Sequence, residues 1–209
     1  MTVEVWSDFS CPFCYIGKTR LERVLDSFIK KAEVNLMYKT FILAPDAPQK
    51  NDENAYLYFS KLKGINIDEA KHLFLNISKT AKQDGLDINW DKVKMTSTYK
   101  AHKFCKFMRE KGLEDKIITK LMVSYFELGL NLADDETLYD IAKEFNIDKK
   151  DVEEALQNHI YDEIIKNELS EAKNMKVLGV PFFLFDKKYL ISGIRRENEF
   201  LEIIEKCFY

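Results

Sequence analysis

The two ends of the chain alternate apolar and polar residues, whereas the middle follows a helical period. Near the N-terminus, Val3 and Val5 alternate with Glu4 and Trp6, which predicts a short strand. The stretch "EVNLMYKTF" predicts a second strand at residues 33–41, and apolar residues at helical spacing from residue 14 to about 31 predict a helix between the two. A β-α-β order implies a parallel pair joined by a right-handed crossover.

The central hundred residues after "APDAPQ" contain almost only helical periodicity. One segment begins with "NIDE", where Asn66 is the expected N-cap and Glu69 completes a capping box. Further helices are expected at residues 98–111, 114–128, 135–145 and 148–158. No repeat relates these segments, and no linker-like composition separates them from the rest.

The strand pattern returns near the C-terminus in "VPFFLF" and "KKYLISG". The turn at Asp186 and Lys187 is short enough for an antiparallel hairpin, and "ENEFLEIIEKCF" predicts a closing helix. The predicted fold class is therefore α/β, a thioredoxin fold interrupted by a large α-helical insertion. Residues 1–42 and 160–209 are expected to form a discontinuous thioredoxin domain, and residues 43–159 the helical insertion domain.

Composition narrows the classes of partner. The 209 residues are 46% hydrophobic and 32% charged, an ordinary globular mixture, and the formal charge of −3 gives no broad attraction to nucleic acid. "MTVEVWSDFS" lacks the basic leader and apolar core of a signal peptide, and no run is long enough to cross a bilayer. We therefore expect a cytoplasmic protein with no membrane partner, in which a structural disulfide would be unusual.

Two of the four cysteines, Cys11 and Cys14, flank Pro12 and Phe13 where the first strand gives way to the helix. The free N–H groups and the positive end of the helix dipole favour the Cys11 thiolate over the thiol. Cys14 should lie about one turn further in. This arrangement allows Cys11 to attack a substrate disulfide and Cys14 to displace the product from the mixed disulfide.

A structural zinc site is the competing interpretation of a Cys-x-x-Cys pair, but it needs two more ligands. His102 and Cys105 are the candidates with suitable spacing. Cys105 also fits a small buried apolar residue, and Cys207 fits packing or an adventitious reactive thiol. No metal is expected on this basis.

Four stretches together carry a resemblance to a known family: "SDFSCPFCYIGK", "STYKAHKF" with "MREKG", "LMVSYFELGLNLADDETL" and "GVPFFLFDKKYLISG". They resemble the DsbA-like thioredoxin-fold oxidoreductases, and in particular their FrnE-type cytoplasmic subgroup. The resemblance implies that Cys11 is the nucleophile, Cys14 the resolving cysteine and Pro181 a cis-proline that faces the pair. It also implies that Val180 presents its backbone to an extended substrate, with Phe13 as a further substrate-binding residue.

The chain departs from the family pattern at four positions. Val5 stands where thioredoxins and DsbA carry a buried acid, so proton handling for Cys14 needs another group; Asp8 is open as either a general base or a turn residue. Phe13 replaces the usual Trp of the subgroup and the His of strongly oxidising DsbA proteins. Arg195 replaces a Gln, and Lys176 a frequent Gly, which implies a different helix ending.

The predicted function is thiol–disulfide oxidoreductase, with the cysteine pair as the redox group and no other cofactor. The expected partners are a disulfide- or thiol-containing protein or small molecule and a cellular dithiol or glutathione as reductant; a homodimer is left open. Two alternatives remain. One is a glutathione-dependent transferase or isomerase of the kappa-class type, which uses a serine at the first position, where this chain has Cys11. The other is a redox-sensing or zinc-holding binding protein.

Overall fold

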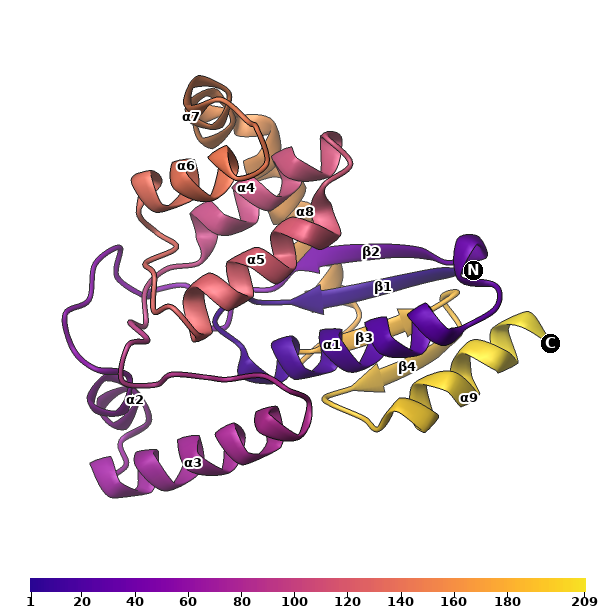
Figure 1. Ribbon diagram of the computed structural model, residues 1–209, viewed down its shortest axis with the longest axis horizontal. Helices are drawn as coiled ribbons and strands as arrows, with labels where there is room; N and C mark the ends of the chain where they lie inside the picture. The colour runs from indigo at the N-terminus through magenta and orange to yellow at the C-terminus, as the bar shows by residue number, and fades with distance from the viewer. The chain divides into compact units, whose positions relative to one another are not determined.

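Four strands form one sheet in the computed structural model, which describes residues 1–209 (Figure 1). The strand order is β2-β1-β3-β4. β1 runs parallel to β2 and antiparallel to β3, and β4 pairs antiparallel with β3, so the predicted crossover pair and hairpin are confirmed. The strands are β1 (Thr2–Ser7), β2 (Asn35–Thr40), β3 (Phe182–Phe185) and β4 (Tyr189–Ser192).

The alternation in β1 places two different surfaces on the two faces of the sheet. Val5 pairs with Phe183 of β3 on one face, and the Phe183 ring packs edge-on against Phe200 of α9 at 5.0 Å. Trp6 lies on the other face, where it packs edge-on against Phe182 at 5.8 Å. Val3–Ser7 of β1 are buried because β2 and β3 pair with its two edges and helices cover both faces of the sheet. The helices that cover them are α1 (Pro12–Ser27), α8 (His159–Asn174) and α9 (Glu197–Phe208).

Helix α1 ends earlier than its periodicity predicts. The helix stops at Ser27 because Phe28 adopts an extended backbone, and the Phe28 ring packs against Phe208 of α9 at 5.3 Å. A short 3-10 turn, η1 (Lys31–Glu33), then leads into β2. The closing helix α9 covers the predicted "ENEFLEIIEKCF" in full.

The C-terminal part of α8 is tied to the sheet by polar contacts. The Trp6 indole N–H donates to the Glu168 carbonyl at 3.3 Å. Lys39 of β2 lies over the Trp6 ring at 4.7 Å and pairs with Glu4 at 2.5 Å and with Glu171 at 2.6 Å. Burial alone would lower the pKa of Lys39, but the bonds to the two carboxylates outweigh it and raise that pKa. These contacts hold α8 against the sheet, and the segment that contains Pro181 follows this helix.

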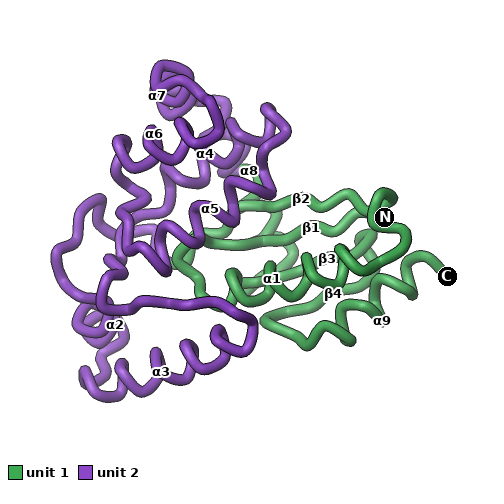
Figure 2. The backbone as a smooth tube through the Cα atoms, viewed as in Figure 1, with its two compact units in different colours: residues 1–43, 167–209 green, residues 44–166 purple.

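The chain divides into two units, Met1–Leu43 with Asn167–Tyr209 and Ala44–Lys166 (Figure 2). Helix α8 begins at His159 and continues without a break through the boundary between Lys166 and Asn167. The sequence predicts this boundary between residues 159 and 160, at the start of the helix. The second unit is all helical. Its remaining helices are α2 (Ala55–Lys63), α3 (Ile67–Gln83), α4 (Tyr99–Glu110), α5 (Glu114–Phe126), α6 (Asp135–Lys143) and α7 (Lys149–Gln157).

The helical unit confirms the local signals in its sequence. The Asn66 side chain accepts the Glu69 N–H, and the Glu69 carboxylate accepts the Asn66 N–H, so the predicted capping box is present at the start of α3. Aromatic packing centres on Phe74, whose ring lies 4.1 Å from that of Trp90. None of the helices has the combination of length and apolar composition that a membrane span requires.

Candidate active site

Cys11 occupies the N-cap of α1, at the point where the sequence changes from strand to helix. Its backbone is extended, and its carbonyl accepts the N–H groups of Cys14 at 3.0 Å and Tyr15 at 3.3 Å. Pro12 follows as the first helical residue, where its missing N–H costs nothing. The first turn of α1 contains no acidic side chain.

Cys14 lies one turn into α1 and is 1% exposed. Burial raises the pKa of its thiol well above the ordinary value, and the neighbouring Cys11 raises it further. The Asp8 backbone and the Ser7 side chain lower the same pKa, but burial outweighs them. Both cysteines are free thiols, and Cys11 is 2% exposed.

The loop before β3 reaches Cys11 from the other end of the chain. The Cys11 thiol donates to the Val180 carbonyl at 3.5 Å. The Val180–Pro181 peptide bond is cis, as the resemblance implies. The Pro181 carbonyl accepts the N–H of Gly193 at 2.8 Å, and Gly193 has a φ of 77°, a conformation that favours glycine. The structure thus brings together Cys11, Cys14, Val180 and Pro181.

Gly17 is a site residue that the sequence analysis missed. A Cβ atom at this position of α1 would lie 3.1 Å from Pro181 Cγ and 3.1 Å from Phe183 Cζ. A side chain at this position would therefore require the Pro181 ring or the Phe183 ring to shift by a few tenths of an ångström. A lone glycine inside a helical pattern is the kind of signal that marks such a close approach.

Asp8 is a turn residue in the structure. Its two carboxylate oxygens accept the backbone N–H groups of Ser10 at 3.2 Å and Leu43 at 2.7 Å, which ties the loop after β1 to the end of β2. Val5, at the position of the acid in thioredoxins, is buried. The carboxylate nearest the cysteines in sequence is therefore committed to the backbone.

Two apolar side chains in the segments that carry the cysteines and Val180 are exposed. Phe13 is 38% exposed and Leu178, two residues before Val180, is 96% exposed.

Arg195 follows Gly193 closely in the sequence. The Arg195 carbonyl accepts a guanidinium N–H of Arg20 at 2.9 Å, and the Arg195 guanidinium pairs with Glu199 at 3.5 Å. Arg195 is therefore part of the junction between α1 and α9.

The remaining cysteines lie elsewhere. Cys105 is buried in α4 of the helical unit, and Cys207 is partly exposed on α9. Burial and the charge of Asp186 raise the pKa of Cys207, while Lys188 and the N-terminal amine lower it. Nowhere in residues 1–209 do three His, Cys, Asp or Glu side chains come together as metal ligands, and neither His102 nor Cys105 is part of such a group.

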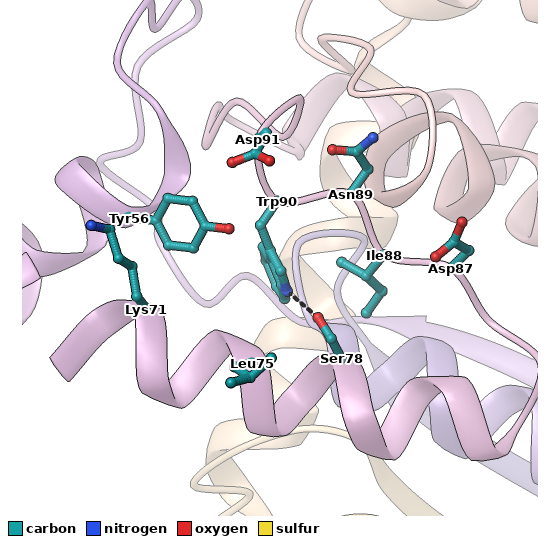
Figure 3. A pocket seen from close by; sticks show the side chains of 9 residues that line it. All are labelled: Tyr56, Lys71, Leu75, Ser78, Asp87, Ile88, Asn89, Trp90 and Asp91. Atoms are coloured by element: carbon teal, nitrogen blue, oxygen red, sulfur yellow. Dashed lines mark hydrogen bonds between the residues drawn. The ribbon is translucent and has the colours of Figure 1, made fainter. Parts of the chain in front are cut away.

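A separate cavity of about 500 Å³ lies wholly within the helical unit (Figure 3). It contains no cysteine, and some of its polar groups pair with one another. The Trp90 N–H donates to the Ser78 hydroxyl at 2.9 Å. Burial raises the pKa of Tyr56, and the charge of Asp91 and a hydrogen bond to it raise that pKa further. Lys71 and Leu75 of α3 complete the wall nearest to Tyr56.

Comparison with known proteins supports the same assignment of family. The sequence profile of the DSBA-like thioredoxin domain matches residues 2–205. The crystal structure of a probable DsbA oxidoreductase from Streptomyces coelicolor superposes with a TM-score of 0.92 at 25% identity, covering 100% of this chain and 90% of that one. The Bacillus subtilis (strain 168) protein YwbO is 25% identical over 186 residues, 87% of this chain and 85% of YwbO.

More distant structures share the fold. The cytosolic disulfide reductase DsbM from Pseudomonas aeruginosa superposes with a TM-score of 0.65 at 12% identity, covering 100% of this chain and 98% of DsbM. The profile match extends over both ends of the chain and the helical segment between them, which is the arrangement described above. The chain belongs to the DSBA-like thioredoxin domain family.

Proposed function

We propose that this protein is a thiol–disulfide oxidoreductase in which Cys11 attacks a substrate disulfide and Cys14 resolves the mixed disulfide. The observation that carries the proposal is the position of the Cys11 sulfur, at the open N-terminus of α1 and 3.5 Å from the Val180 carbonyl. The helix end favours a thiolate, and the backbone of the proline loop offers hydrogen-bonding groups to an extended peptide. Membership of the DSBA-like family supports the same chemistry.

The exchange proceeds in two balanced steps. The Cys11 thiolate attacks one sulfur of the substrate disulfide, a Cys11–substrate disulfide forms, and the other substrate sulfur leaves as a thiolate that takes up a proton. The Cys14 thiolate then attacks the Cys11 sulfur, a Cys11–Cys14 disulfide forms, and the second substrate thiol is released. The substrate gains two electrons and the protein loses two. The reverse sequence oxidises a dithiol substrate.

Burial of the two sulfurs restricts which disulfides can react. Both cysteines are almost fully buried, whereas Phe13 between them and Leu178 in the segment before Val180 are exposed. The proposed substrate is therefore a small disulfide, or one in a flexible peptide segment, and Phe13, Val180 and Pro181 are its proposed binding residues. A disulfide within a rigid folded protein should react far more slowly.

Trapping experiments test the assignment of the two cysteines. Cys14→Ser should accumulate a covalent mixed disulfide with a disulfide-containing peptide, because the first step is intact and the second is blocked. Cys11→Ser should abolish exchange and form no adduct. Intact-protein mass spectrometry after an acid quench measures both outcomes.

The adduct must be separated from reactions of other thiols. Both variants are therefore prepared with Cys207→Ser, which removes the partly exposed cysteine on α9. An adduct with Cys11→Ser and none with Cys14→Ser would reverse the assignment. The absence of exchange in the parent protein under all peptide and pH conditions would refute the proposed activity.

The reductant that regenerates the dithiol is a separate proposal. We infer a cellular dithiol protein or glutathione, since either can reopen the Cys11–Cys14 disulfide by the same exchange. The FrnE-type subgroup and the cytoplasmic location remain predictions from the sequence. Reduction of the oxidised protein by glutathione at physiological concentrations, followed by thiol titration, tests the glutathione part directly.

A further inference from the structure

Arg195 lies beside the loop that contains Pro181, two residues beyond Gly193. The hairpin register that pairs Phe182 with Ser192 extends one step further, because the Gly193 N–H donates to the Pro181 carbonyl at 2.8 Å. A Cβ atom built on Gly193 would lie 4.0 Å from Nη1 of Arg195. The Arg195 guanidinium therefore folds back toward the glycine that is bonded to Pro181.

The backbone of Arg195 is also held by α1, the helix that carries the two cysteines. Nη1 of Arg20 donates to the Arg195 carbonyl at 2.9 Å. Arg20 is three residues after Gly17, which lies close to Pro181. The bond is therefore made about one turn beyond the point where α1 approaches the proline loop. The cysteine helix and the proline loop together position Arg195.

The Arg195 guanidinium retains donors for a ligand. Nε pairs with Glu199 at 3.5 Å, and Nη1 donates to the Ile194 carbonyl at 2.9 Å. These contacts use two of the five guanidinium N–H groups, and the side chain is 42% exposed. Glu199 also accepts the Arg196 N–H at 2.9 Å, as part of the cap of α9. An exposed ion pair of this kind contributes little to stability, so a ligand carboxylate can replace Glu199 or bind beside it.

The charge around Arg195 favours an anion. Residues 18–23 and 195–199 together contain five basic and three acidic side chains, which leaves a charge of +2 at the junction between α1 and α9, although the whole chain has a charge of −3. Each of the three acidic side chains pairs with a basic one of the same two segments: Glu22 with Lys18, Glu197 with Arg23 and Glu199 with Arg195. A negatively charged group that approaches Pro181 is therefore attracted toward this junction.

An extended substrate can bring such a group to Arg195. In the proposed exchange the substrate cysteine reacts with Cys11 while the substrate backbone pairs with Val180, which precedes Pro181. Side chains alternate along an extended strand, so the residues two positions before and after the substrate cysteine share its side of the strand, at about 7 Å. A carboxylate at such a position suits a guanidinium, which can bind both of its oxygens at once.

We propose that Arg195 is a specificity-determining residue that binds a carboxylate on the disulfide substrate, close to the reacting sulfur. This inference rests on the proposed function and names its substrate class, disulfides that carry a carboxylate about two residues from the cysteine. An acidic side chain of a peptide and the terminal carboxylate of a small disulfide present the same group. Arg195 exchanges no proton or electron with the substrate, so the two steps of the exchange stay balanced as described.

Two peptide disulfides that differ only in charge measure this preference. The acidic probe is the disulfide-linked dimer of acetyl-Glu-Ala-Cys-Ala-Glu-amide, and the neutral probe has Gln in place of Glu. Each is mixed with reduced protein in a Cys207→Ser background, and the released peptide thiol is measured after an acid quench. The ratio of the two rate constants, divided by the ratio for dithiothreitol, removes the intrinsic difference between the two disulfides. The parent protein should prefer the acidic probe about threefold at low salt, and less in about 0.5 M sodium chloride.

Arg195→Gln and Arg23→Gln form a matched pair. Arg23 is 45% exposed and pairs with Glu197 of α9 at 3.4 Å, so the two substitutions remove the same charge from equally exposed ion pairs at one junction. Arg195→Gln should lower the corrected ratio to about one, whereas Arg23→Gln should keep most of the parent preference. Arg195→Lys should keep part of it, because an ammonium has the charge without the two-pronged geometry. Circular dichroism establishes that each variant is folded.

Oxidised glutathione and its diester at the two glycine carboxylates distinguish the sources of the carboxylate. A preference for oxidised glutathione that is lost in Arg195→Gln assigns the site to small disulfides as well as to peptides. A preference that depends on Arg195 only with the peptide pair assigns it to acidic side chains of peptides. Both results support a carboxylate site at Arg195.

The remaining outcomes separate this inference from the proposed function. Equal corrected rates for the acidic and neutral probes in the parent protein, with oxidised glutathione and its diester also equal, would overturn the role of Arg195 while leaving the exchange intact. An equal loss of preference in Arg195→Gln and Arg23→Gln would also overturn it, because the effect would then come from the general charge of the junction. Failure of the parent protein to react with any of the four disulfides would instead contradict the proposed function.

Discussion

Single residues at the start of α1 determine how strongly the Cys11 thiolate is stabilised. The helix end has no acidic neighbour in its first turn, and no side chain caps it. Phe13 is the residue between the cysteines that can be changed without disturbing the core, because it is 38% exposed. An apolar ring adds no charge at this position.

Phe13→His should make the Cys11–Cys14 disulfide more oxidising. A protonated imidazole beside the sulfur stabilises the thiolate by about 0.2–1 kcal/mol, as partly exposed ion pairs do, and this favours the reduced form. The reduction potential should rise by about 5–20 mV, more at pH 6 than at pH 8, since histidine loses its charge near pH 6.5. Equilibration with glutathione at the two pH values measures the shift.

The corresponding control is Phe13→Asn, which removes the ring without adding a charge. The potential of Phe13→Asn should depend on pH as the parent potential does. If the His and Asn variants have the same potential at pH 6, charge at this position does not set the redox equilibrium.

At the level of elements, the end of α8 determines how the chain enters the proline loop. Val177 N–H donates to the Ala172 carbonyl and Lys176 N–H to the Lys173 carbonyl, the pair of bonds that closes a helix with a left-handed residue. That residue is Lys176, with a φ of 57°. The sequence predicts a different helix ending at Lys176. In the structure, this lysine ends the helix in a left-handed conformation that glycine adopts at no steric cost.

Lys176→Gly should stabilise the protein by about 0.5–1 kcal/mol, because relief of the left-handed conformation exceeds the entropy that glycine adds to the unfolded chain. The melting temperature should rise by about 1–4 °C. Lys173→Gly makes the same chemical change inside α8, where helical φ applies, and should destabilise by about 1 kcal/mol. Urea unfolding of the three proteins decides the matter; a loss of stability in Lys176→Gly would show that the lysine side chain contributes more than its backbone costs.

For the whole molecule, buried titratable groups make stability depend on pH. Burial raises the pKa of Cys14 well above 9.0. Burial and a carboxylate partner raise the pKa values of Tyr99 and Tyr161 to about 12. A group whose pKa is higher in the folded state holds its proton more tightly there. Its contribution to the free energy of unfolding is therefore complete below its pKa in the unfolded state, and it is lost as pH rises toward its pKa in the folded state.

The reduced protein should therefore lose stability above pH 9 faster than reduced Cys14→Ser. The tyrosines are common to both proteins, so the difference between them isolates Cys14. It should grow by at most about 1.4 kcal/mol per pH unit between pH 9 and 10. Urea unfolding under reducing conditions from pH 7.5 to 10 measures it, and parallel curves for the two proteins would contradict the raised pKa of Cys14.

The features that the sequence predicts correctly depend on residues that are close together in the chain. The capping box at Asn66 and the hairpin turn at Asp186 and Lys187 depend on residues close together in the chain, and both are present as predicted. The same is true of the cysteine pair at the start of α1. The sequence predicts that α1 continues to about residue 31, whereas the helix ends at Ser27. The contact that favours this end joins Phe28 to Phe208, which is far away in the sequence.

Periodicity, caps and turn residues thus suffice to establish the order of elements and to place Cys11 and Cys14 at a helix start. The approach of Val180 to Cys11, across 169 positions, depends on how α1, β1 and β3 pack, with Gly17 of α1 close to Pro181 and Phe183. Local signals act within a turn or two of chain, whereas the surroundings of a buried sulfur are decided by the volumes and donors that packing brings to it.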